Sequence, residues 1–186
     1  MHLLFKMAWV LRALIYSPFF KAFPMPGYLG GPCFLMGVNR MKFGRKVRIF
    51  PGLRAECLGA GTLTIGDNVS IGQGFHVIAK GDLKIGSNVL ISSSVLVTDT
   101  EHSYLDVTRP VLDQEDAVSR TEIGDRCFIG VGACIQAGTI LGEGCVIGSH
   151  AVVRGVFPPN SVIVGSPAKV VRRYDEPTGK WERTAH

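Results

Sequence analysis

The feature that most constrains how this chain folds is a repeat of six residues. A branched aliphatic residue, in most cases followed by glycine, recurs at this spacing in successive runs. The repeats begin at Ile65, Ile71, Ile85, Ile91, Ile123, Ile129, Ile135, Leu141 and Ile147. Nine copies are too many for a chance run of Ile-Gly pairs in an α/β protein, so the pattern indicates a repeat architecture.

A period of six matches neither an α-helix, which repeats at 3.6 residues, nor a half-buried strand, which repeats at two. Six residues make one short strand and one corner, and three such units close a triangular coil. The residue four positions after each aliphatic should face the core and be small, because the corner narrows there: Val69, Val89, Val95, Cys127, Ala133, Thr139, Cys145 and Ala151. Left-handed backbone angles at the corners should be supplied by Gly66, Asp67, Asn68, Gly86, Asn88, Gly124, Asp125 and Gly142. The predicted fold class is all-β, a parallel β-helix in which each coil covers the next.

Two irregularities interrupt the winding. The spacing between Val77 and Ile85 is eight, which predicts a small bulge at one corner, and about twenty residues after His102 leave the coil as a loop. Phe157, together with the Pro-Pro-Asn run that follows it, should end the winding. We therefore divide the chain into an N-terminal apolar, helical segment (1–42), a β-helix domain (43–172) with a loop insertion at about 103–122, and a C-terminal tail (173–186).

Composition fits one folded domain, because 46% of the 186 residues are hydrophobic. The net charge of +5 indicates an anionic ligand or surface. The basic residues form no long run with interleaved aromatic residues, which argues against nucleic acid as a partner. The five cysteines are odd in number and include no C-x-x-C pair, so we expect reduced, buried thiols in a cytoplasmic protein.

The N-terminus resembles an export signal only superficially. Arg12 interrupts its apolar run, Pro18 breaks it, and no small-residue cleavage site follows. The run is also too short to span a bilayer. Two interpretations stay open. One is a helix packed on the protein body. The other is peripheral membrane contact through an interfacial helix, whose apolar rings would be Phe5, Trp9, Phe19 and Phe20, with Lys6, Arg12 and Lys21 among the headgroups.

The chemistry is expected at the long loop, because loops on a repetitive scaffold often carry function. His102 stands where the chain departs from the coil, with Asp99 and Glu101 close in sequence. A histidine held by a carboxylate in one tautomer can act as a general base near neutral pH. His102 and Asp99 are therefore the candidate catalytic residues.

Three motifs carry a family resemblance: IGSNVLISSSVLVTDTEH with its loop histidine, IGDRCFIGVGACIQAGTILGEGCVIGSHAVV, and PPNSVIVGSPAKVVR after the last coil. The stretch from about Ile65 to Arg172 resembles the hexapeptide-repeat acetyltransferases, in the branch of maltose, galactoside, colanic-acid and O-antigen acetyltransferases. The resemblance implies a left-handed β-helix, a homotrimer with active sites between subunits, and acetyl-CoA as co-substrate without a metal.

The same resemblance assigns roles to particular residues. His102 would take the proton of the acceptor hydroxyl, which attacks the thioester directly. Acetyl-CoA would lie along the coils, contacting Val131, Ser149 and Arg154 with its pantetheine arm and Lys169 and Arg172 with its phosphates.

The chain also departs from the family pattern. Phe128 stands where most relatives have tryptophan, and GSHAVV replaces GAGSVV, which puts His150 near the expected coenzyme A channel. An acceptor-binding asparagine of the sugar acetyltransferases has no clear match, and Gln73 and His76 lie nearest to it. These two are our candidate acceptor-binding residues.

The predicted function is O-acetylation of a sugar hydroxyl, on a sugar or lipid-linked saccharide, in the synthesis of a surface polysaccharide or lipopolysaccharide. N-acetylation of an aminosugar or another small acceptor is the alternative. A non-catalytic scaffold is a third possibility, and a zinc enzyme like the γ-type carbonic anhydrases is a fourth. The zinc site would use His76, His102 and His150. Counting six-residue units, however, puts His76 and His102 on different faces of the prism, whereas zinc needs converging ligands.

Overall fold

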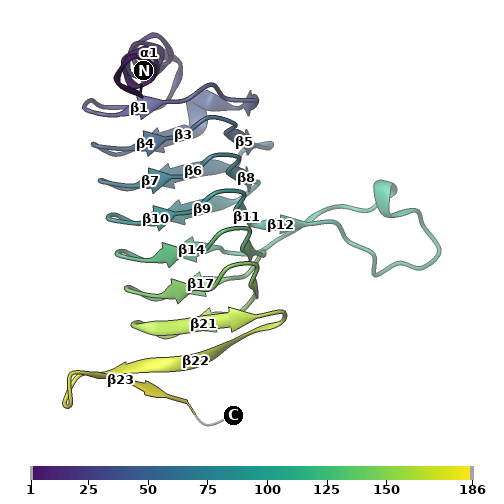
Figure 1. The fold of residues 1–186 in the computed structure, drawn as a ribbon. Helices are drawn as coiled ribbons and strands as arrows, with labels where there is room; N and C mark the ends of the chain where they lie inside the picture. The colour runs from purple at the N-terminus through teal and green to yellow at the C-terminus, as the bar shows by residue number, and fades with distance from the viewer. Residues whose placement is uncertain (1, 185–186) are drawn as a thin grey trace.

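A computed structural model describes residues 2–184, and it confirms the parallel β-helix. The chain winds through three sheets, named A, B and C, whose strands stack coil upon coil (Figure 1). The parallel part of sheet B contains β1 (Tyr28–Leu29), β4 (Arg48–Ile49), β7 (Ser70–Ile71), β10 (Leu90–Ile91), β15 (Phe128–Ile129), β18 (Val146–Ile147) and β21 (Ser161–Gly165). Sheet C contains β2 (Phe34–Met36), β5 (Arg54–Cys57), β8 (His76–Ala79), β11 (Leu96–Thr98), β16 (Cys134–Ile135) and β19 (Val152–Val153). Sheet A contains β3 (Met41–Phe43), β6 (Thr62–Ile65), β9 (Asp82–Ile85), β14 (Glu122–Ile123), β17 (Ile140–Leu141) and β20 (Val156–Phe157).

The six-residue period arises because the repeated aliphatic side chains stack inside the coil. Ile71, Ile91 and Ile129 are successive partners in sheet B, and all three are buried. The eight small residues predicted at the corners are buried as well. The corner is nevertheless wider in one place than the pattern indicated, since Phe75 occupies the same position after Ile71 and is fully buried.

The glycines that follow the aliphatic residues have a different role from the one predicted. Gly66, Gly86, Gly124 and Gly142 do not adopt positive φ, whereas Asn68 and Asn88 do, at 55° and 58°. A Cβ on Gly66 would lie 2.8 Å from the backbone carbon of Gly86 in the next coil. Glycine is therefore required there because neighbouring coils approach closely, and asparagine provides the left-handed turn.

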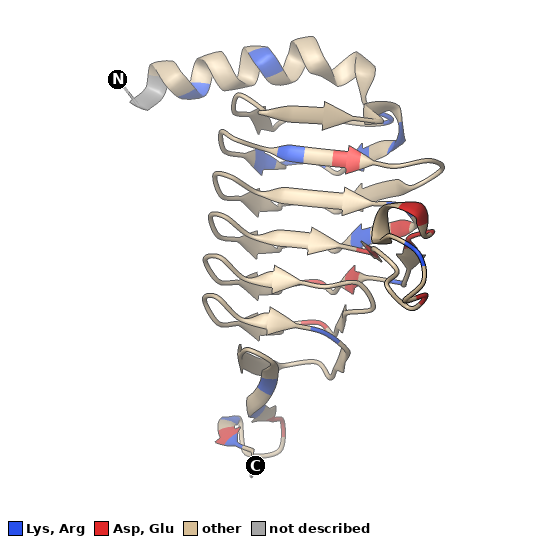
Figure 2. Cartoon of the chain, turned by 90° about the vertical axis from the view of Figure 1, so that its right-hand side faces the viewer, with Lys and Arg blue, Asp and Glu red and all other residues tan. Residues whose placement is uncertain are grey.

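The parallel ladders extend upstream of Phe43, into residues that the sequence analysis placed in the N-terminal segment. β1 pairs with β4, and β2 pairs with β5. Helix α1 (His2–Tyr16) and the 3₁₀ helix η1 (Ser17–Phe19) precede this first coil, and η2 (Val38–Arg40) lies within it. α1 lies across the end of the solenoid, perpendicular to the stacking direction (Figures 1 and 2).

Contacts of α1 show that it packs on the body of the protein. The ring of Trp9 lies 5.6 Å from the rings of both Tyr28 and Phe50, and Ala13 is buried. Phe20 is buried against Phe43. Trp9 and Phe20 thus face the coil, and the interfacial interpretation assigned these two rings to the wrong side. No helix within residues 2–184 is long and apolar enough to cross a membrane.

The C-terminal end also differs from the pattern. β21 follows the Pro-Pro-Asn run and still pairs in parallel with β18, so the winding continues past Phe157. The chain then reverses, and β22 (Ala168–Asp175) and β23 (Lys180–Arg183) extend sheet B as antiparallel strands. β22 also contacts β19 of sheet C, which brings the start of the tail to that face.

Candidate active site

A β-hairpin leaves the solenoid at the corner between sheets C and A (Figure 1). Its arms are β12 (Thr100–Glu101) and β13 (Ala117–Val118), and the 3₁₀ helix η3 (Val111–Asp113) lies in its tip. Thr100 pairs with Val118 and Glu101 with Ala117. Continuing this antiparallel register by one residue places His102 opposite Asp116.

His102 and Asp116 form the central contact of the hairpin. His102 Nδ1 lies 2.6 Å from Asp116 Oδ1, and the other carboxylate oxygen of Asp116 accepts a hydrogen bond from Lys80 Nζ at 2.8 Å. Lys80 comes from the corner after β8, one coil before the hairpin. The three side chains therefore form one line of contacts, from ammonium to carboxylate to imidazole. This arrangement fixes a histidine tautomer.

The charges of this line favour an ionised Asp116. The hydrogen bond from Lys80 is the largest cause that lowers the pKa of Asp116 below its ordinary 3.8, and the bond to His102 lowers it further. An ionised Asp116 accepts the Nδ1 proton of His102 and leaves Nε2 with its lone pair free. A histidine in this state can take a proton from a hydroxyl that approaches Nε2.

The hairpin tip is held in shape by Gln114. Its Oε1 accepts hydrogen bonds from Ser103 Oγ and the backbone N–H of Asp106, and its Nε2 donates to the carbonyls of Asp106 and Arg109. Beside it lies an open cavity of about 500 Å³, lined by Lys80, His102, Leu112, Gln114, Glu115 and Asp116. The imidazole of His102 faces this cavity and is 75% exposed. The catalytic candidate is thus accessible to a substrate.

Asp99 has a different surrounding from the one the sequence pattern led us to expect. It is buried, and its two oxygens accept the backbone N–H groups of Lys80 and Gly81 at 2.7 and 2.9 Å. These amides lie where the departing hairpin interrupts the backbone ladder to the next coil. Asp99 caps the corner, and Asp116 is the carboxylate that contacts the imidazole.

The predicted coenzyme-binding residues fall into two groups. Arg154 follows β19 and makes an ion pair of 3.0 Å with Glu101 at the base of the hairpin. Lys169 and Arg172 are exposed on β22. These three cations lie on the C-terminal side of the hairpin.

Val131 and Ser149 belong to a second group, which lies at the corner between sheets B and C. Backbone hydrogen bonds along this corner run from Ser94 N to Gln73 O, from Gly132 N to Ser93 O and from His150 N to Val131 O. Gln73, Val131 and Ser149 therefore lie in one column that spans four coils, with Ser93 between Gln73 and Val131. Gln73 and Val131 share the lining of one groove.

His76 lies on the outer surface of sheet C, between this column and the hairpin. Its Nε2 is 3.3 Å from Glu56 Oε1, and Glu56 also accepts a hydrogen bond from Arg54. Arg54 is the largest cause that lowers the pKa of Glu56. Sheet C thus carries a charged patch at β5 and β8, and the predicted site residues frame its outer surface from both edges.

The count of six-residue units was wrong in placing His76 and His102 on different faces. β8 pairs with β11, and the hairpin with His102 follows β11 directly. Even so, within residues 2–184 no three His, Cys, Asp or Glu side chains come together in a way that could hold a metal ion.

Sequence reasoning missed Asp116 and Lys80. The insertion was treated as an irregular loop, so no register connected residue 116 with residue 102. Pairing a short strand at Thr100 with one at Val118 would have predicted a hairpin. The signal for a carboxylate opposite His102 was the Glu-Asp pair just before Ala117.

Comparison with known proteins decides the family. Residues 120–155 match the model of the bacterial transferase hexapeptide (six repeats). Over 159 residues the chain is 32% identical to the putative lipopolysaccharide biosynthesis O-acetyl transferase WbbJ of Escherichia coli K12, covering 82% of this chain and 81% of that protein. The chain belongs to the hexapeptide-repeat acetyltransferase family.

Solved structures agree with this acetyltransferase fold. The N-acyltransferase AntD from Bacillus cereus, in complex with dTDP and 3-hydroxybutyryl-CoA, aligns with a TM-score of 0.72 and 16% identity, covering 90% of each chain. The hexapeptide-repeat acetyltransferase VCA0836 from Vibrio cholerae O1 biovar eltor, complexed with acetyl coenzyme A, aligns with a TM-score of 0.63 and 22% identity, covering 89% of this chain and 78% of that one.

Proposed function

We propose that this acetyltransferase moves an acetyl group from acetyl-CoA to a sugar hydroxyl during synthesis of a surface polysaccharide or lipopolysaccharide. The observation that carries the proposal is the Asp116–His102 pair on an accessible hairpin at the edge of sheet C. The similarity to a protein named as a lipopolysaccharide biosynthesis O-acetyl transferase supports the acceptor class. The free thiols of all five cysteines fit the reducing cytoplasm, where we place the reaction.

In the proposed reaction, Nε2 of His102 removes the proton of the acceptor hydroxyl. The oxygen attacks the thioester carbonyl, the C–S bond breaks, and the proton passes from His102 to the departing coenzyme A thiolate. Asp116 accepts a hydrogen bond from Nδ1 throughout and stabilises the imidazolium that forms in between. A backbone N–H at the coil edge would stabilise the oxyanion, a contribution typical of acyl transfer.

Acetyl-CoA would lie along the coils from the hairpin toward β22. Arg154, near the hairpin base, and Lys169 and Arg172, farther along, offer cations in that direction. Arg172 lies directly opposite Arg183 in the antiparallel pair of β22 and β23. Two like charges in register destabilise a sheet unless an anion lies nearby, so this pair supports a phosphate site. Val131 and Ser149 would contact the pantetheine arm, and Gln73 and His76 would contact the acceptor.

We further propose a homotrimer, in which a neighbouring chain would complete the site beside His102. The hairpin extends away from its own solenoid (Figure 1). On it, Leu105, Val107 and Leu112 are 84%, 94% and 93% exposed. A neighbouring solenoid would cover these side chains and close the cavity beside His102. Light scattering should then give a mass of about three times the 20.1 kDa of the chain.

The central experiment measures transfer from labelled acetyl-CoA to a panel of free sugars, nucleotide sugars, lipid-linked saccharides and aminosugars. We expect O-acetylated saccharide with the wild-type protein, and a loss of about two to four orders of magnitude for His102→Ala, the usual contribution of a general base. Product only on an amino group would establish the N-acetyltransferase alternative. Full activity of a folded His102→Ala variant would refute the role of His102.

A further inference from the structure

Helix α1 carries apolar side chains on two sides. One side packs on the coil, and the other faces solvent. The outer face of α1 and η1 consists of Leu4, Phe5, Met7, Leu11, Leu14, Ile15 and Phe19, which are 50–69% exposed. Spacings of three and four residues gather Leu4, Met7, Leu11, Leu14 and Ile15 into one stripe along α1. On an ordinary surface helix the exposed stripe is polar, and a contiguous apolar patch marks a site of interaction. The outer face therefore indicates a partner that covers it.

The charge of the same end of the molecule is strongly positive. Residues 1–55 contain nine Lys or Arg and no Asp or Glu, because the first acidic residue is Glu56. The remainder of the chain contains eleven basic and fifteen acidic residues. The chain's net positive charge thus comes from its N-terminal end, while acidic residues gather around the hairpin (Figure 2).

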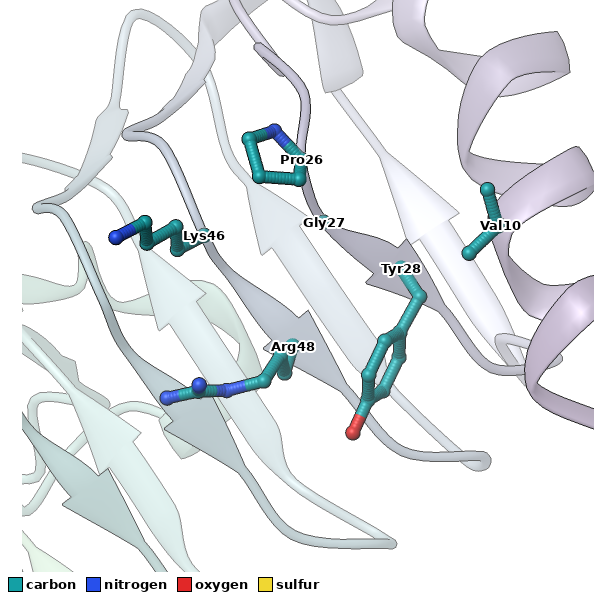
Figure 3. A pocket seen from close by; sticks show the side chains of 6 residues that line it. All are labelled: Val10, Pro26, Gly27, Tyr28, Lys46 and Arg48. Carbon is teal, nitrogen blue, oxygen red and sulfur yellow. The ribbon is translucent and has the colours of Figure 1, made fainter. Parts of the chain in front are cut away.

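Several cations of this end lie in the coils next to α1, behind its apolar outer face. Lys21, Arg45 and Lys46 are exposed. Lys46 and Arg48 also line an apolar cavity of about 320 Å³ next to α1, with Val10, Pro26 and Tyr28. Figure 3 shows the side chains of Lys46 and Arg48 extending in the same direction, away from α1. An apolar outer face with cations in the coils behind it matches the layering of a bilayer surface, in which acyl chains lie beneath anionic headgroups.

We propose that the outer face of α1 and η1 docks this protein onto an anionic phospholipid bilayer. The charge decides between a bilayer and a second copy of the chain. Two copies joined through these faces would bring together two ends that each carry nine cations and no anions, whereas an anionic leaflet neutralises them. The docking does not depend on the proposed acetyl transfer, because it involves other residues and is measured without activity.

Docking would also orient the solenoid. α1 lies perpendicular to the direction in which the coils stack (Figure 2). A bilayer that contacts the outer face of α1 would therefore align the stacking direction with the membrane normal. β2 and β11 are three strand positions apart in sheet C. At about 4.8 Å per strand, the hairpin lies about 14 Å farther from the membrane than the first coil does. If the proposed function holds, this position suits a saccharide whose lipid anchor stays in the membrane.

The test is flotation of the full-length protein with vesicles of phosphatidylcholine alone or with 30 mol% phosphatidylglycerol. We expect binding to the anionic vesicles that weakens as salt is raised. The triple variant Leu4→Ser, Met7→Ser, Leu11→Ser should bind at least tenfold more weakly, because it removes apolar surface that enters the membrane. Its matched control replaces three exposed apolar residues at the opposite end of the solenoid, Val156→Ser, Tyr174→Ser, Trp181→Ser, and should bind like wild type.

A second pair of variants tests the charge. Neutralising Lys21, Arg45 and Lys46 to glutamine should weaken binding to anionic vesicles about a hundredfold, since each cation near such a surface contributes about fivefold. The control neutralises three exposed cations at the opposite end, Arg173, Lys180 and Arg183, and changes the net charge equally.

Several results would overturn the proposal. The first is no flotation of the wild type, and the second is equal loss in a variant and its control. The third is association through α1, seen in light scattering as a species of doubled mass that the Leu4, Met7, Leu11 variant converts to the smaller one. Thermal unfolding of each variant confirms that it is folded.

Discussion

Replacing Asp116 with asparagine tests the assignment of the residue that orients His102. The substitution preserves size but removes the charge that accepts the Nδ1 proton and the partner of Lys80. An amide can present its NH₂ group to Nδ1 instead, which favours the tautomer with the proton on Nε2. That tautomer has no lone pair at Nε2 to take the proton of a hydroxyl that approaches there. Transfer should therefore slow without loss of acetyl-CoA binding.

The expected size of the effect follows from the geometry. A hydrogen bond to a charged group contributes about 1.5–3 kcal/mol. The 2.6 Å contact between His102 and Asp116 is short, but the imidazole is 75% exposed and water competes for it. The low end of the range, about 1.5 kcal/mol, corresponds to about a tenfold lower kcat, because 1.36 kcal/mol is a factor of ten in rate. Covering of the hairpin by a neighbouring subunit would raise the effect toward a hundredfold.

Steady-state transfer from acetyl-CoA measures this effect, with Glu115→Gln as the matched control. Glu115 lines the same cavity and loses the same charge, but no hydrogen bond connects it to the imidazole. In a His102→Ala background, Asp116→Asn should cost nothing further, whereas a merely structural role would still lower the rate. The orienting role is refuted if Asp116→Asn retains the kcat of Glu115→Gln, or if its cost persists without His102.

Three further outcomes follow from the structure. Lys169→Gln with Arg172→Gln should raise KM for acetyl-CoA with little change in kcat, and an unchanged KM would contradict their phosphate role. Asp99→Ala should lower the free energy of unfolding by about 2 kcal/mol in denaturant titration, because two half-buried amides lose their acceptor; unchanged stability would contradict the corner-capping role. The Tm advantage of wild type over Asp116→Asn should be present above pH 3.8, the ordinary value, and disappear as the pH falls through the lowered pKa of Asp116. A Tm difference that persists well below that pH would mean that another interaction causes it.

Much of the fold could be predicted because every six-residue unit makes the same contacts with the units in the coils before and after it. The aliphatic residue of each unit stacks on its equivalents, so Ile71, Ile91 and Ile129 identify the core without knowledge of any distant contact. The ends were harder, since coils that lack the motif, such as those of β1 and β21, are fixed by pairing with their neighbours. The role of Gly66 was also misread, because the approach of Gly86 is a contact between coils and leaves no trace in the local sequence.

The sequence by itself determined the scaffold, the family and the histidine at which the repeat fails. Only the tertiary structure decided which carboxylate serves that histidine. Asp99 is three residues from His102 but turns inward to satisfy two amides, whereas Asp116, fourteen residues away, is brought opposite by the register of the hairpin. The structure likewise decided that α1 turns its apolar stripe outward. Both outcomes depend on which groups lack a partner once the coils have stacked, and a linear pattern does not contain that information.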